Sequence, residues 1–226
     1  MNLFNQEKYN LQKFDIDNYI FADHSMKEKL IKLGKTKLSG IDSLLFMSTE
    51  GNGGTFLMCS SLRLLTLNKM DYIMITGDYY SQIANMAVDE FIEICAPYSY
   101  IVFDNLEFGC SRPKQNKWLN NVFTLLRKEG KKTLSTITVM DTKDFFTPPF
   151  IKESRHEVFY SLSQPSIYPE IVKMILGHLE IPATEEVIKN LSSNITCSVR
   201  ELEGICVCYA ADKILEMNSL KSKTSL

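Results

Sequence analysis

The stretch Ser48-Thr-Glu-Gly51-Asn-Gly53-Gly54-Thr55 decides the fold of this chain. An apolar run, Ser43–Met47, precedes it, and a helical pattern, Thr55–Leu67, follows it. Glycines at such a junction let backbone N–H groups converge on phosphate oxygens at the N-terminus of a helix. The segment therefore predicts a strand, a phosphate-binding loop and a helix in that order. Taken alone, it also fits a glycine-rich strand–helix turn that binds no ligand.

One position departs from the phosphate-binding pattern G-x-x-x-x-G-K-[ST]. Gly54 stands where the pattern has lysine, and Thr55 stands where it has the hydroxyl that binds Mg²⁺. The missing lysine removes a charge-assisted hydrogen bond worth roughly 1.5–3 kcal/mol and the cation that offsets charge developing on the γ-phosphate. We expect ADP or ATP with Mg²⁺ to bind weakly or not at all, and hydrolysis to be inefficient. The candidate contacts are Gly51, Asn52, Gly53, Gly54 and Thr55.

A second candidate contact ends an apolar strand about 50 residues downstream, in Tyr100-Ile-Val-Phe-Asp104-Asn105-Leu106-Glu107. In P-loop enzymes, an acid at this place holds hydrated Mg²⁺ and the next acid helps to orient the attacking water. Asp104 can do the first task, and Thr55 with Asp104 forms the candidate metal site. Asn105 cannot act as a base at neutral pH. The alternative is that Asp104 only ends a strand, where Asp and Asn often form turns.

Short apolar runs alternate with helical patterns over most of the chain, which indicates an α/β fold. Most of the runs are short and apolar on both faces, as is typical of buried parallel strands. The predicted strands are Ser43–Met47, Tyr72–Thr76, Tyr100–Phe103, Thr133–Val139 and Val158–Leu162. The predicted helices are Ser25–Leu33, Thr55–Leu67, Gln82–Cys95 and Lys117–Lys128, with Gly130 in the position of a left-handed C-terminal cap.

The pattern changes after Gln164-Pro165, where three helices follow one another without a strand. They are predicted at Tyr168–Leu179, Thr184–Leu191 and Ser198–Met217. Ser198-Val-Arg-Glu201 has the S-x-x-E capping-box pattern of a helix start. The sequence thus predicts an N-terminal tail (1–14), an α/β core (15–165), a small all-α unit (166–218) and a polar tail (219–226).

The composition argues against several classes of function, although it leaves open a local patch that contacts DNA. Of 226 residues, 45% are hydrophobic and 23% charged, and the net charge of -2 provides no global basic field for nucleic acid or acidic membranes. The six cysteines form no C-x-x-C pair and none is spaced with a histidine, so we expect reduced thiols and a cytoplasmic protein rather than a zinc site. Neither a signal peptide nor a membrane span is expected.

Val199-Arg200-Glu201-Leu202-Glu203-Gly204 resembles the V-R-E-L-E-G motif in the lid domain of the DnaA family. Asp17-Asn-Tyr-Ile-Phe resembles the family's segment before the first helix, and the resemblance covers roughly residues 15–217. It implies an AAA+ P-loop fold: a parallel five-stranded sheet flanked by helices, followed by a small all-α lid. It also implies that Arg200 reaches from the lid to a bound nucleotide. No counterpart of the family's helix-turn-helix domain follows, so we expect no sequence-specific binding of duplex DNA.

Two further details resemble Hda, the regulatory paralogue within the DnaA family. Glu50-Gly51-Asn52-Gly53 matches its loop form E-G-x-G, and Asp104–Glu107 matches its strand end D-N-x-E. Hda keeps a basic residue where this chain has Gly54. Its N-terminal peptide for the DNA polymerase sliding clamp is not recognisable in Met1–Leu11, where Leu3-Phe4 is the nearest remnant. Clamp binding is therefore an open question.

The resemblance also implies an arginine that acts on the nucleotide of a neighbouring subunit. Glu153-Ser154-Arg155 resembles the S-R pair after the fourth strand, if one residue is missing before Tyr160. The alternative is an exposed loop arginine. Thr136 and Thr138 are candidates for the polar sensor position of the fourth strand.

These resemblances imply a regulator of replication initiation that docks on DnaA and promotes hydrolysis of DnaA-bound ATP through Arg155, without being a self-sufficient ATPase. Two alternatives remain at this stage: a nucleotide-free AAA+ scaffold and a weak autonomous ATPase. Single-stranded DNA binding across the core ranks last, because no basic–aromatic stripe is evident.

Overall fold

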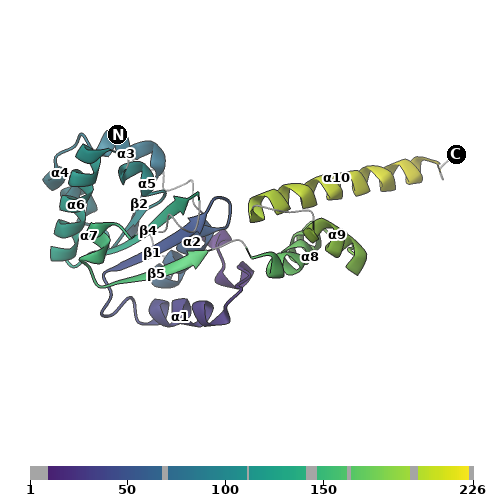
Figure 1. The fold of residues 1–226 in the computed structure, drawn as a ribbon, viewed down its shortest axis with the longest axis horizontal. Coiled ribbons are helices and arrows are strands. Elements are labelled where there is room, and N and C mark those ends of the chain that lie inside the picture. Colours follow the sequence, from purple (N-terminus) through teal and green to yellow (C-terminus); the bar gives the residue numbers. More distant parts are fainter. Residues whose placement is uncertain are drawn as a thin grey trace. The chain divides into compact units, whose positions relative to one another are not determined.

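The computed structural model describes residues 10–67, 71–110, 112–140, 147–161, 164–193 and 198–223 (Figure 1). The chain divides into two compact units. The first holds the residues up to Tyr19 and Asp23–Ser161, and the second holds Ile20–Ala22 and the residues from Leu162 onward. The chain thus leaves the first unit after Tyr19 and again after Ser161. The short departure at Ile20–Ala22 has no counterpart in the sequence-based division near Pro165.

A five-stranded parallel sheet forms the centre of the first unit, with the strand order β2-β3-β4-β1-β5. In register, Ser43 lies opposite Thr133 on β4 and His156 on β5. The parallel α/β architecture predicted from the sequence is confirmed, and Leu162, its expected last strand residue, lies outside the described residues. Because the strands are parallel, the segments after β1, β3 and β4 emerge at one edge of the sheet. The strands are β1 (Ser43–Thr49), β2 (Tyr72–Ile75), β3 (Tyr100–Phe103), β4 (Lys132–Val139) and β5 (His156–Ser161).

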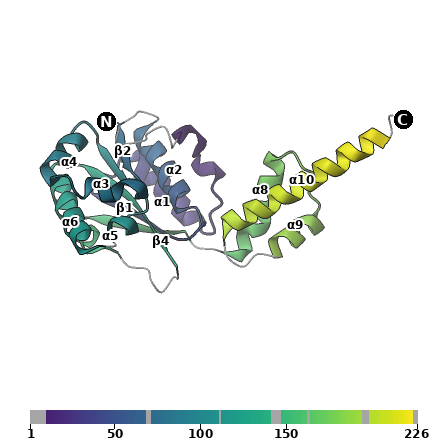
Figure 2. The same ribbon diagram turned by 90° about the horizontal axis from the view of Figure 1, so that it is seen from above.

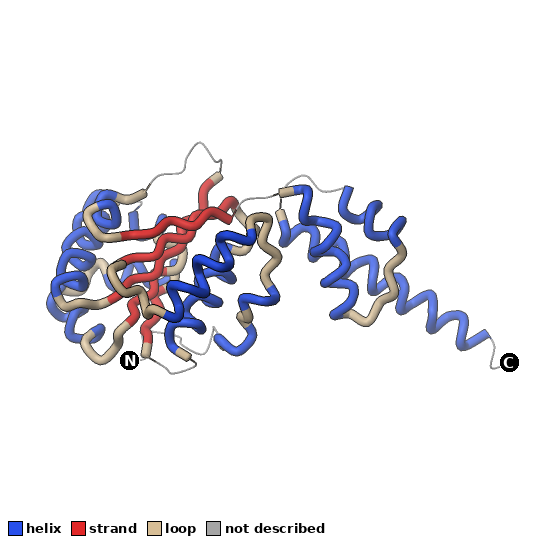
Figure 3. Tube along the Cα trace, turned by 90° about the horizontal axis from the view of Figure 1, so that it is seen from below, coloured by secondary structure: helices blue, strands red, loops and turns tan. Residues whose placement is uncertain are grey.

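Helices cover both faces of this sheet, with α1 and α2 on one side and α4 and α6 on the other (Figures 2 and 3). Short 3₁₀ turns lie at Leu11–Lys13, Ile16–Asn18 and Gly77–Tyr79. The helices of the first unit are α1 (His24–Lys35), α2 (Gly54–Thr66), α3 (Tyr80–Ile83), α4 (Val88–Cys95), α5 (Glu107–Cys110), α6 (Pro113–Lys128) and α7 (Pro149–Lys152).

The single helix predicted over Gln82–Cys95 is wrong, because the structure breaks it into α3 and α4. The indole N–H of Trp118 on α6 donates to the backbone carbonyl of Met86 in the break, at 2.9 Å. This bond gives the Met86 carbonyl a donor from outside the helix, so the carbonyl does not need a backbone N–H of a continuing helix. In return, the buried indole gains the acceptor that it requires. Tertiary packing therefore overrides the local helical propensity of this segment.

The C-terminal cap predicted after α6 is confirmed. Gly130 has φ +69°, its N–H bonds the carbonyl of Arg127 at 3.1 Å, and the N–H of Lys131 bonds that of Leu126 at 2.9 Å. This pair of bonds is a Schellman motif, which glycine favours because it has no Cβ to strain the left-handed conformation. The cap turns the chain sharply into β4.

An aromatic cluster anchors β3 to the helices that cover it. The ring centroids of Phe103 and Phe123 lie 4.9 Å apart, and those of Phe91 and Trp118 lie 5.0 Å apart. All four side chains are buried. On the opposite face of the sheet, the helix α2 buries Leu57, Met58 and Leu62. Packing on both sides fixes the ends of β1 and β3, where the candidate site lies.

The second unit consists of α8 (Tyr168–His178), α9 (Glu185–Ser193) and α10 (Val199–Lys223), after a 3₁₀ turn at Pro165–Ile167. The three predicted helices are confirmed. Their shared core contains Tyr168, Val172, Leu176, Ile188, Leu202 and Cys206, and Ile20 packs against it. The helix α10 extends past the predicted end at Met217, to Lys223. No helix in the described ranges is long and apolar enough to cross a membrane.

Candidate functional site

The segment between β1 and α2 forms a tight turn with two left-handed glycines. Gly51 has φ +73°, and Gly53 has φ +85° and caps α2, whose first bond runs from the N–H of Leu57 to its carbonyl. The side-chain amide of Asn52 donates to Thr49 Oγ1 at 2.6 Å and to the carbonyl of Glu50 at 3.3 Å. Asn52 thus holds the turn closed from inside. The predicted strand–loop–helix is present, and the loop's contact with a nucleotide stays a prediction.

Three elements meet at the carboxylate of Asp104, directly after β3. The hydroxyl of Thr55 on α2 donates to Asp104 Oδ1 at 3.0 Å, and that of Thr136 on β4 donates to the same oxygen at 2.7 Å. Asp104 and Thr136 are almost completely buried. The structure therefore brings together Thr55, Asp104 and one of the two sensor candidates, Thr136.

The hydroxyl and carboxylate oxygens of Thr55 and Asp104 belong to the ligand chemistry that Mg²⁺ prefers. This donor set fits the ion: Asp104 would hold its water shell, and Thr55 would bind it directly. Elsewhere, the described residues bring no three His, Cys, Asp or Glu side chains together as a metal-binding group.

The same cluster holds the backbone of Asn105, the residue after Asp104. It has φ +57°, a conformation that asparagine tolerates better than most residues, and its N–H donates to Thr136 Oγ1 at 2.7 Å. Its amide nitrogen donates to Glu107 Oε1 at 3.4 Å, and in the alternative orientation of the amide the nitrogen lies 3.2 Å from both carboxylate oxygens of Asp104. Asn105 therefore supports the carboxylate and offers no base for hydrolysis.

The next acid along the chain, Glu107, is turned towards β4. Its Oε2 accepts a hydrogen bond from the N–H of Thr138 at 3.2 Å. Burial raises the pKa of this carboxyl above its usual value. Glu107 thus ties the first turn of α5 to the sheet, and Thr138, the other sensor candidate, meets Glu107 through its backbone.

Two residues that the sequence did not single out also hold the loop. The ring of Tyr19 lies against Gly53, where an added Cβ would meet Tyr19 Cε2 at 3.0 Å. The hydroxyls of Tyr19 and Ser161 are hydrogen-bonded, and that of Ser161 donates to the carbonyl of Asn52. Burial raises the pKa of the Tyr19 phenol. Tyr19 falls in the segment resembling the DnaA family, but nothing in the sequence marks Ser161.

Arg155 lies at the opposite edge of the sheet. Its Nε and Nη2 donate to the two carboxylate oxygens of Asp42 at 3.0 and 2.9 Å, just before β1 begins. The guanidinium is the largest of the causes that hold the pKa of Asp42 below its usual range. The seven residues of β1 separate this edge from the phosphate loop by about 20 Å. Arg155 is thus remote from the loop of its own chain, and its side chain is 69% exposed.

Arg200 lies on the first turn of α10 in the second unit and is exposed. The hydroxyl of Ser198 accepts a hydrogen bond from the N–H of Glu201 at 3.2 Å, which is the expected capping contact. The V-R-E-L-E-G segment therefore begins a capped helix, as the sequence predicts. The contact of Arg200 with a nucleotide stays a prediction.

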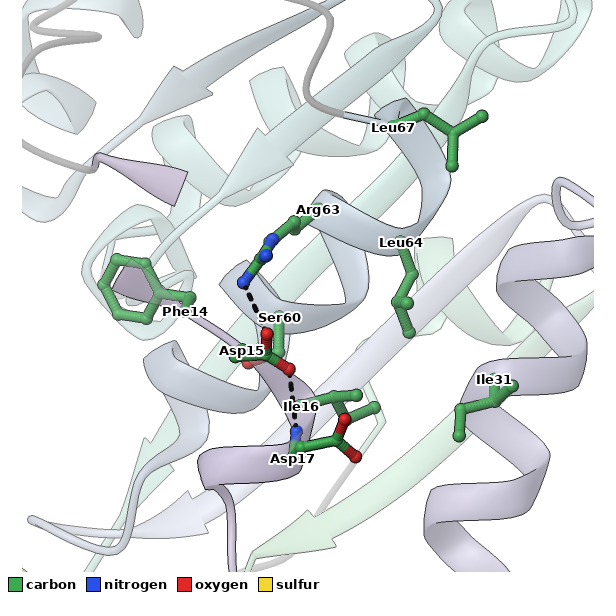
Figure 4. Close-up of a pocket in the computed structure, with 9 residues that line it drawn as sticks. All are labelled: Phe14, Asp15, Ile16, Asp17, Ile31, Ser60, Arg63, Leu64 and Leu67. Atoms are coloured by element: carbon green, nitrogen blue, oxygen red, sulfur yellow. Dashed lines mark hydrogen bonds and ion pairs between the residues drawn. The ribbon is translucent and has the colours of Figure 1, made fainter. Parts of the chain in front are cut away.

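A separate groove of about 310 Å³ lies between α2, α1 and the segment before α1 (Figure 4). Arg63 on α2 spans it and pairs with Asp15 at 3.0 Å. Ser60 also lines the groove, and its hydroxyl has no hydrogen-bond partner among the described residues. Phe14, Ile16, Ile31 and Leu64 make its walls mostly apolar. Neither Thr55 nor Asp104 lines this groove.

Comparison with known proteins identifies the fold. No protein-family model and no curated protein sequence matches the chain. Among solved structures, the replication initiator DnaA bound to AMPPCP and single-stranded DNA matches with a TM-score of 0.72 and 17% identity, over 92% of this chain and 69% of that chain. Domain III of Thermotoga maritima DnaA matches with a TM-score of 0.65 and 16% identity, over 98% of this chain and 92% of that chain.

The Thermotoga maritima RuvB Holliday junction branch migration motor matches less closely, with a TM-score of 0.63 and 13% identity over 93% of this chain and 67% of that chain. At such identities the likeness extends to the fold alone. The first unit has the AAA+ P-loop fold, as the resemblance to the DnaA family implied, and the all-α unit follows it.

Proposed function

We propose that this chain is a DnaA-like regulator of replication initiation that acts on the nucleotide of a neighbouring AAA+ subunit, in the manner of Hda. The observation that carries the proposal is the separation of its two sites. The phosphate loop lacks its cation at Gly54, whereas an exposed arginine, Arg155, lies paired with Asp42 at the opposite edge of the same sheet. An arginine that reaches a neighbour's triphosphate offsets charge in the transition state and accelerates hydrolysis by orders of magnitude.

In this proposal, the phosphate loop of the chain itself binds a nucleotide without hydrolysing it efficiently. Backbone N–H groups at Gly51, Gly53 and Gly54 with the hydroxyl of Thr55 would bind ADP or ATP, with Asp104 holding Mg²⁺. Arg200 would reach the nucleotide from the second unit, as the family motif implies. Asn105 in place of an acid leaves the attacking water without a base, so turnover in this loop would be slow.

The partner proposed here is DnaA itself, in the cytoplasm, and its similarity in fold to this chain supports a shared mode of AAA+ contact. The sliding clamp would require a peptide within Met1–Leu11, of which the described residues include Asn10 and Leu11. Clamp binding therefore forms no part of the proposal.

The test is a single-turnover assay with ATP-loaded DnaA from the same organism. Adding this protein should accelerate phosphate release, and Arg155→Ala should remove the effect. Arg127→Ala is the matched control. Like Arg155, Arg127 is an arginine at the surface of the first unit, and it donates to the backbone carbonyl of Glu153. A rate unchanged by Arg155→Ala would refute the arginine assignment, and a wild-type protein without effect would refute the regulator.

One observation favours a nucleotide-free scaffold as the second candidate. The Asp104 carboxylate already receives hydrogen bonds from Thr55 and Thr136. A carboxylate satisfied in this way holds the loop without any ion. A thermal-shift series separates the candidates, because a ligand at a hundredfold excess over its Kd stabilises by about 2.7 kcal/mol. No shift with millimolar ADP or ATP would favour the scaffold, whereas turnover by the chain alone that is lost in Asp104→Ala would favour a weak autonomous ATPase.

A further inference from the structure

The arginine on which the proposed function depends is already engaged within its own chain. Arg155 donates through Nε and Nη2 to the two carboxylate oxygens of Asp42, at 3.0 and 2.9 Å. A forked pair of this kind is among the strongest contacts that an arginine and an acid form. A guanidinium whose charge is balanced by a carboxylate is a poor counter-charge for a second anion. The pair therefore opposes the action of Arg155 on a neighbouring triphosphate.

The two partners differ in exposure and in how they are held. The side chain of Asp42 is 13% exposed, whereas that of Arg155 is 69% exposed. The carbonyl of Arg155 accepts hydrogen bonds from the N–H of Asp42 at 2.7 Å and from that of Ser43 at 3.2 Å. These backbone bonds fix the main chain of Arg155 to the start of β1. The guanidinium can then leave the carboxylate by rotation of its own side chain, without a change in the sheet.

A second cation stays with the carboxylate. Lys132, the first residue of β4, has its Nζ 3.4 Å from Asp42 Oδ1, the same oxygen that accepts from Arg155 Nη2. The side chain of Lys132 is 23% exposed, and its Nζ also donates to the carbonyl of Ile41 at 2.6 Å. Removing one partner of a buried ion pair is costly because it leaves a charge uncompensated. Lys132 reduces that cost, because Asp42 keeps a cation when Arg155 leaves.

We propose that Asp42 is a latch, which holds the Arg155 guanidinium in the free chain and gives it up to the triphosphate of a neighbouring AAA+ subunit when the two proteins dock. The phosphate group carries more charge than the single carboxylate that it replaces, and Lys132 remains to bind the vacated oxygen. Since the released arginine is the minor form in the free chain, it acts only where a triphosphate competes successfully with Asp42. This inference deepens the proposed function and rests on it for the role of Arg155.

Single-turnover hydrolysis by ATP-loaded DnaA, measured with a subsaturating amount of this chain, tests the latch. Asp42→Asn keeps the shape of the side chain and removes its charge. It should raise the stimulated rate about fivefold, which corresponds to about 1 kcal/mol for an ion pair with one exposed member. Asp15→Asn is the matched control, because Asp15 also pairs with an arginine, Arg63, at 3.0 Å. This control should stimulate like wild type.

Lys132 provides a second test with the opposite sign. In Lys132→Gln, the departure of Arg155 would leave Asp42 without a cation, so the stimulated rate should fall severalfold. Adding Asp42→Asn should restore the rate to that of Asp42→Asn alone, because no charge is then left behind. A merely structural role of Lys132 would lower the rate in both variants.

The pair can also be observed without DnaA. A forked ion pair hinders rotation about the Nε–Cζ bond, so the side-chain nitrogen NMR spectrum of the free chain at low temperature should show separate Nη1 and Nη2 signals for Arg155. These signals should merge in Asp42→Asn and stay separate in Asp15→Asn, and Arg155→Ala identifies them by their loss. Should Asp42→Asn fail to fold, the wild-type spectrum and the rate in Lys132→Gln decide the matter.

Two results would overturn the latch alone. One is a merged pair of Arg155 signals in the wild-type free chain. The other is a rate in Asp42→Asn equal to or below that of wild type while Arg155→Ala abolishes stimulation, in which case the arginine acts in DnaA as proposed without being held back. Stimulation that is absent in wild type, or that survives in Arg155→Ala, overturns the proposed function and the latch together.

Discussion

Replacing Thr136 with valine should destabilise the first unit strongly although the two side chains have nearly the same shape. The hydroxyl of Thr136 donates to Asp104 Oδ1 and accepts from the N–H of Asn105, both at 2.7 Å. Thr136 is 2% exposed and Asp104 is 3% exposed, so water cannot readily replace the lost hydroxyl. Valine would leave both a carboxylate oxygen and a backbone N–H short of a partner.

The loss in the free energy of unfolding can be worked out from these two hydrogen bonds. A hydrogen bond to a charged group contributes about 1.5–3 kcal/mol, and a buried N–H left without an acceptor costs about 1–3 kcal/mol. Since Thr55 still donates to the same carboxylate oxygen, we expect a loss near the lower end, about 3 kcal/mol in total. With a slope of about 2 kcal/mol/M, the urea midpoint would fall by about 1.5 M. Trp118, the only tryptophan and a buried residue of the first unit, reports this transition by fluorescence.

Two controls make the reasoning refutable. Thr136→Ser keeps the hydroxyl and loses one methyl group, so it should cost only about 1 kcal/mol. Ser135→Ala removes the adjacent hydroxyl on β4, which is buried and without a partner among the described residues, so stability should be unchanged or raised. A loss in Thr136→Val no larger than that in Thr136→Ser would show that the hydroxyl does not hold the cluster together.

Three further predictions concern single residues. Burial raises the pKa of Glu107 in the folded state above its usual 4.5. The protonated carboxyl therefore favours folding below pH 4.5, and this contribution to stability is lost as the pH rises through the folded-state pKa. Urea unfolding at a series of pH values should show a free energy of unfolding that falls with pH, and the fall should be smaller in Glu107→Gln. Tyr19→Phe should cost about 1 kcal/mol and speed amide exchange at residues 51–53, and Ser161→Ala should do the same. Gly130→Ala should destabilise the protein by about 1 kcal/mol because its φ is +69°. Gly177→Ala in the helix α8 should stabilise it, since an added Cβ meets no atom within 4 Å at either position and only Gly130 has a left-handed backbone. A change of stability in the same direction for both variants would contradict the argument.

The strands β2 and β3 and most of β1 could be predicted from the sequence because they are continuous apolar runs, and burial on both faces requires that composition. The cap at Gly130 followed from one residue type and its position after a helix. The break at residues 84–87 could not be predicted, because it depends on Trp118, which lies 32 residues beyond Met86. Local patterns carry no information about such a partner.

The candidate site shows the same division. Gly53 and Thr55 follow a motif whose spacing is fixed, Asp104 ends a strand about 50 residues downstream, and the structure brings Thr55 and Asp104 to 3.0 Å. Ser161 is an ordinary polar residue at the end of a strand, and its role appears only when β5 is placed beside β1. Arg155 was singled out by resemblance and its role stays a prediction, whereas its partner Asp42 is 113 residues away and belongs to no motif.

Contacts within the chain hold the loop from three sides. Asn52 closes it from within, Thr55 ties its helix to Asp104, and Ser161 holds the carbonyl of Asn52 while bonded to Tyr19. Tyr19 and Ser161 are also the residues after which the chain leaves the first unit. If the loop binds a nucleotide as proposed, a ligand that rearranges it would alter the hydrogen bonds at both departures. These contacts depend on backbone shape, so they would respond to occupancy without chemistry at the γ-phosphate.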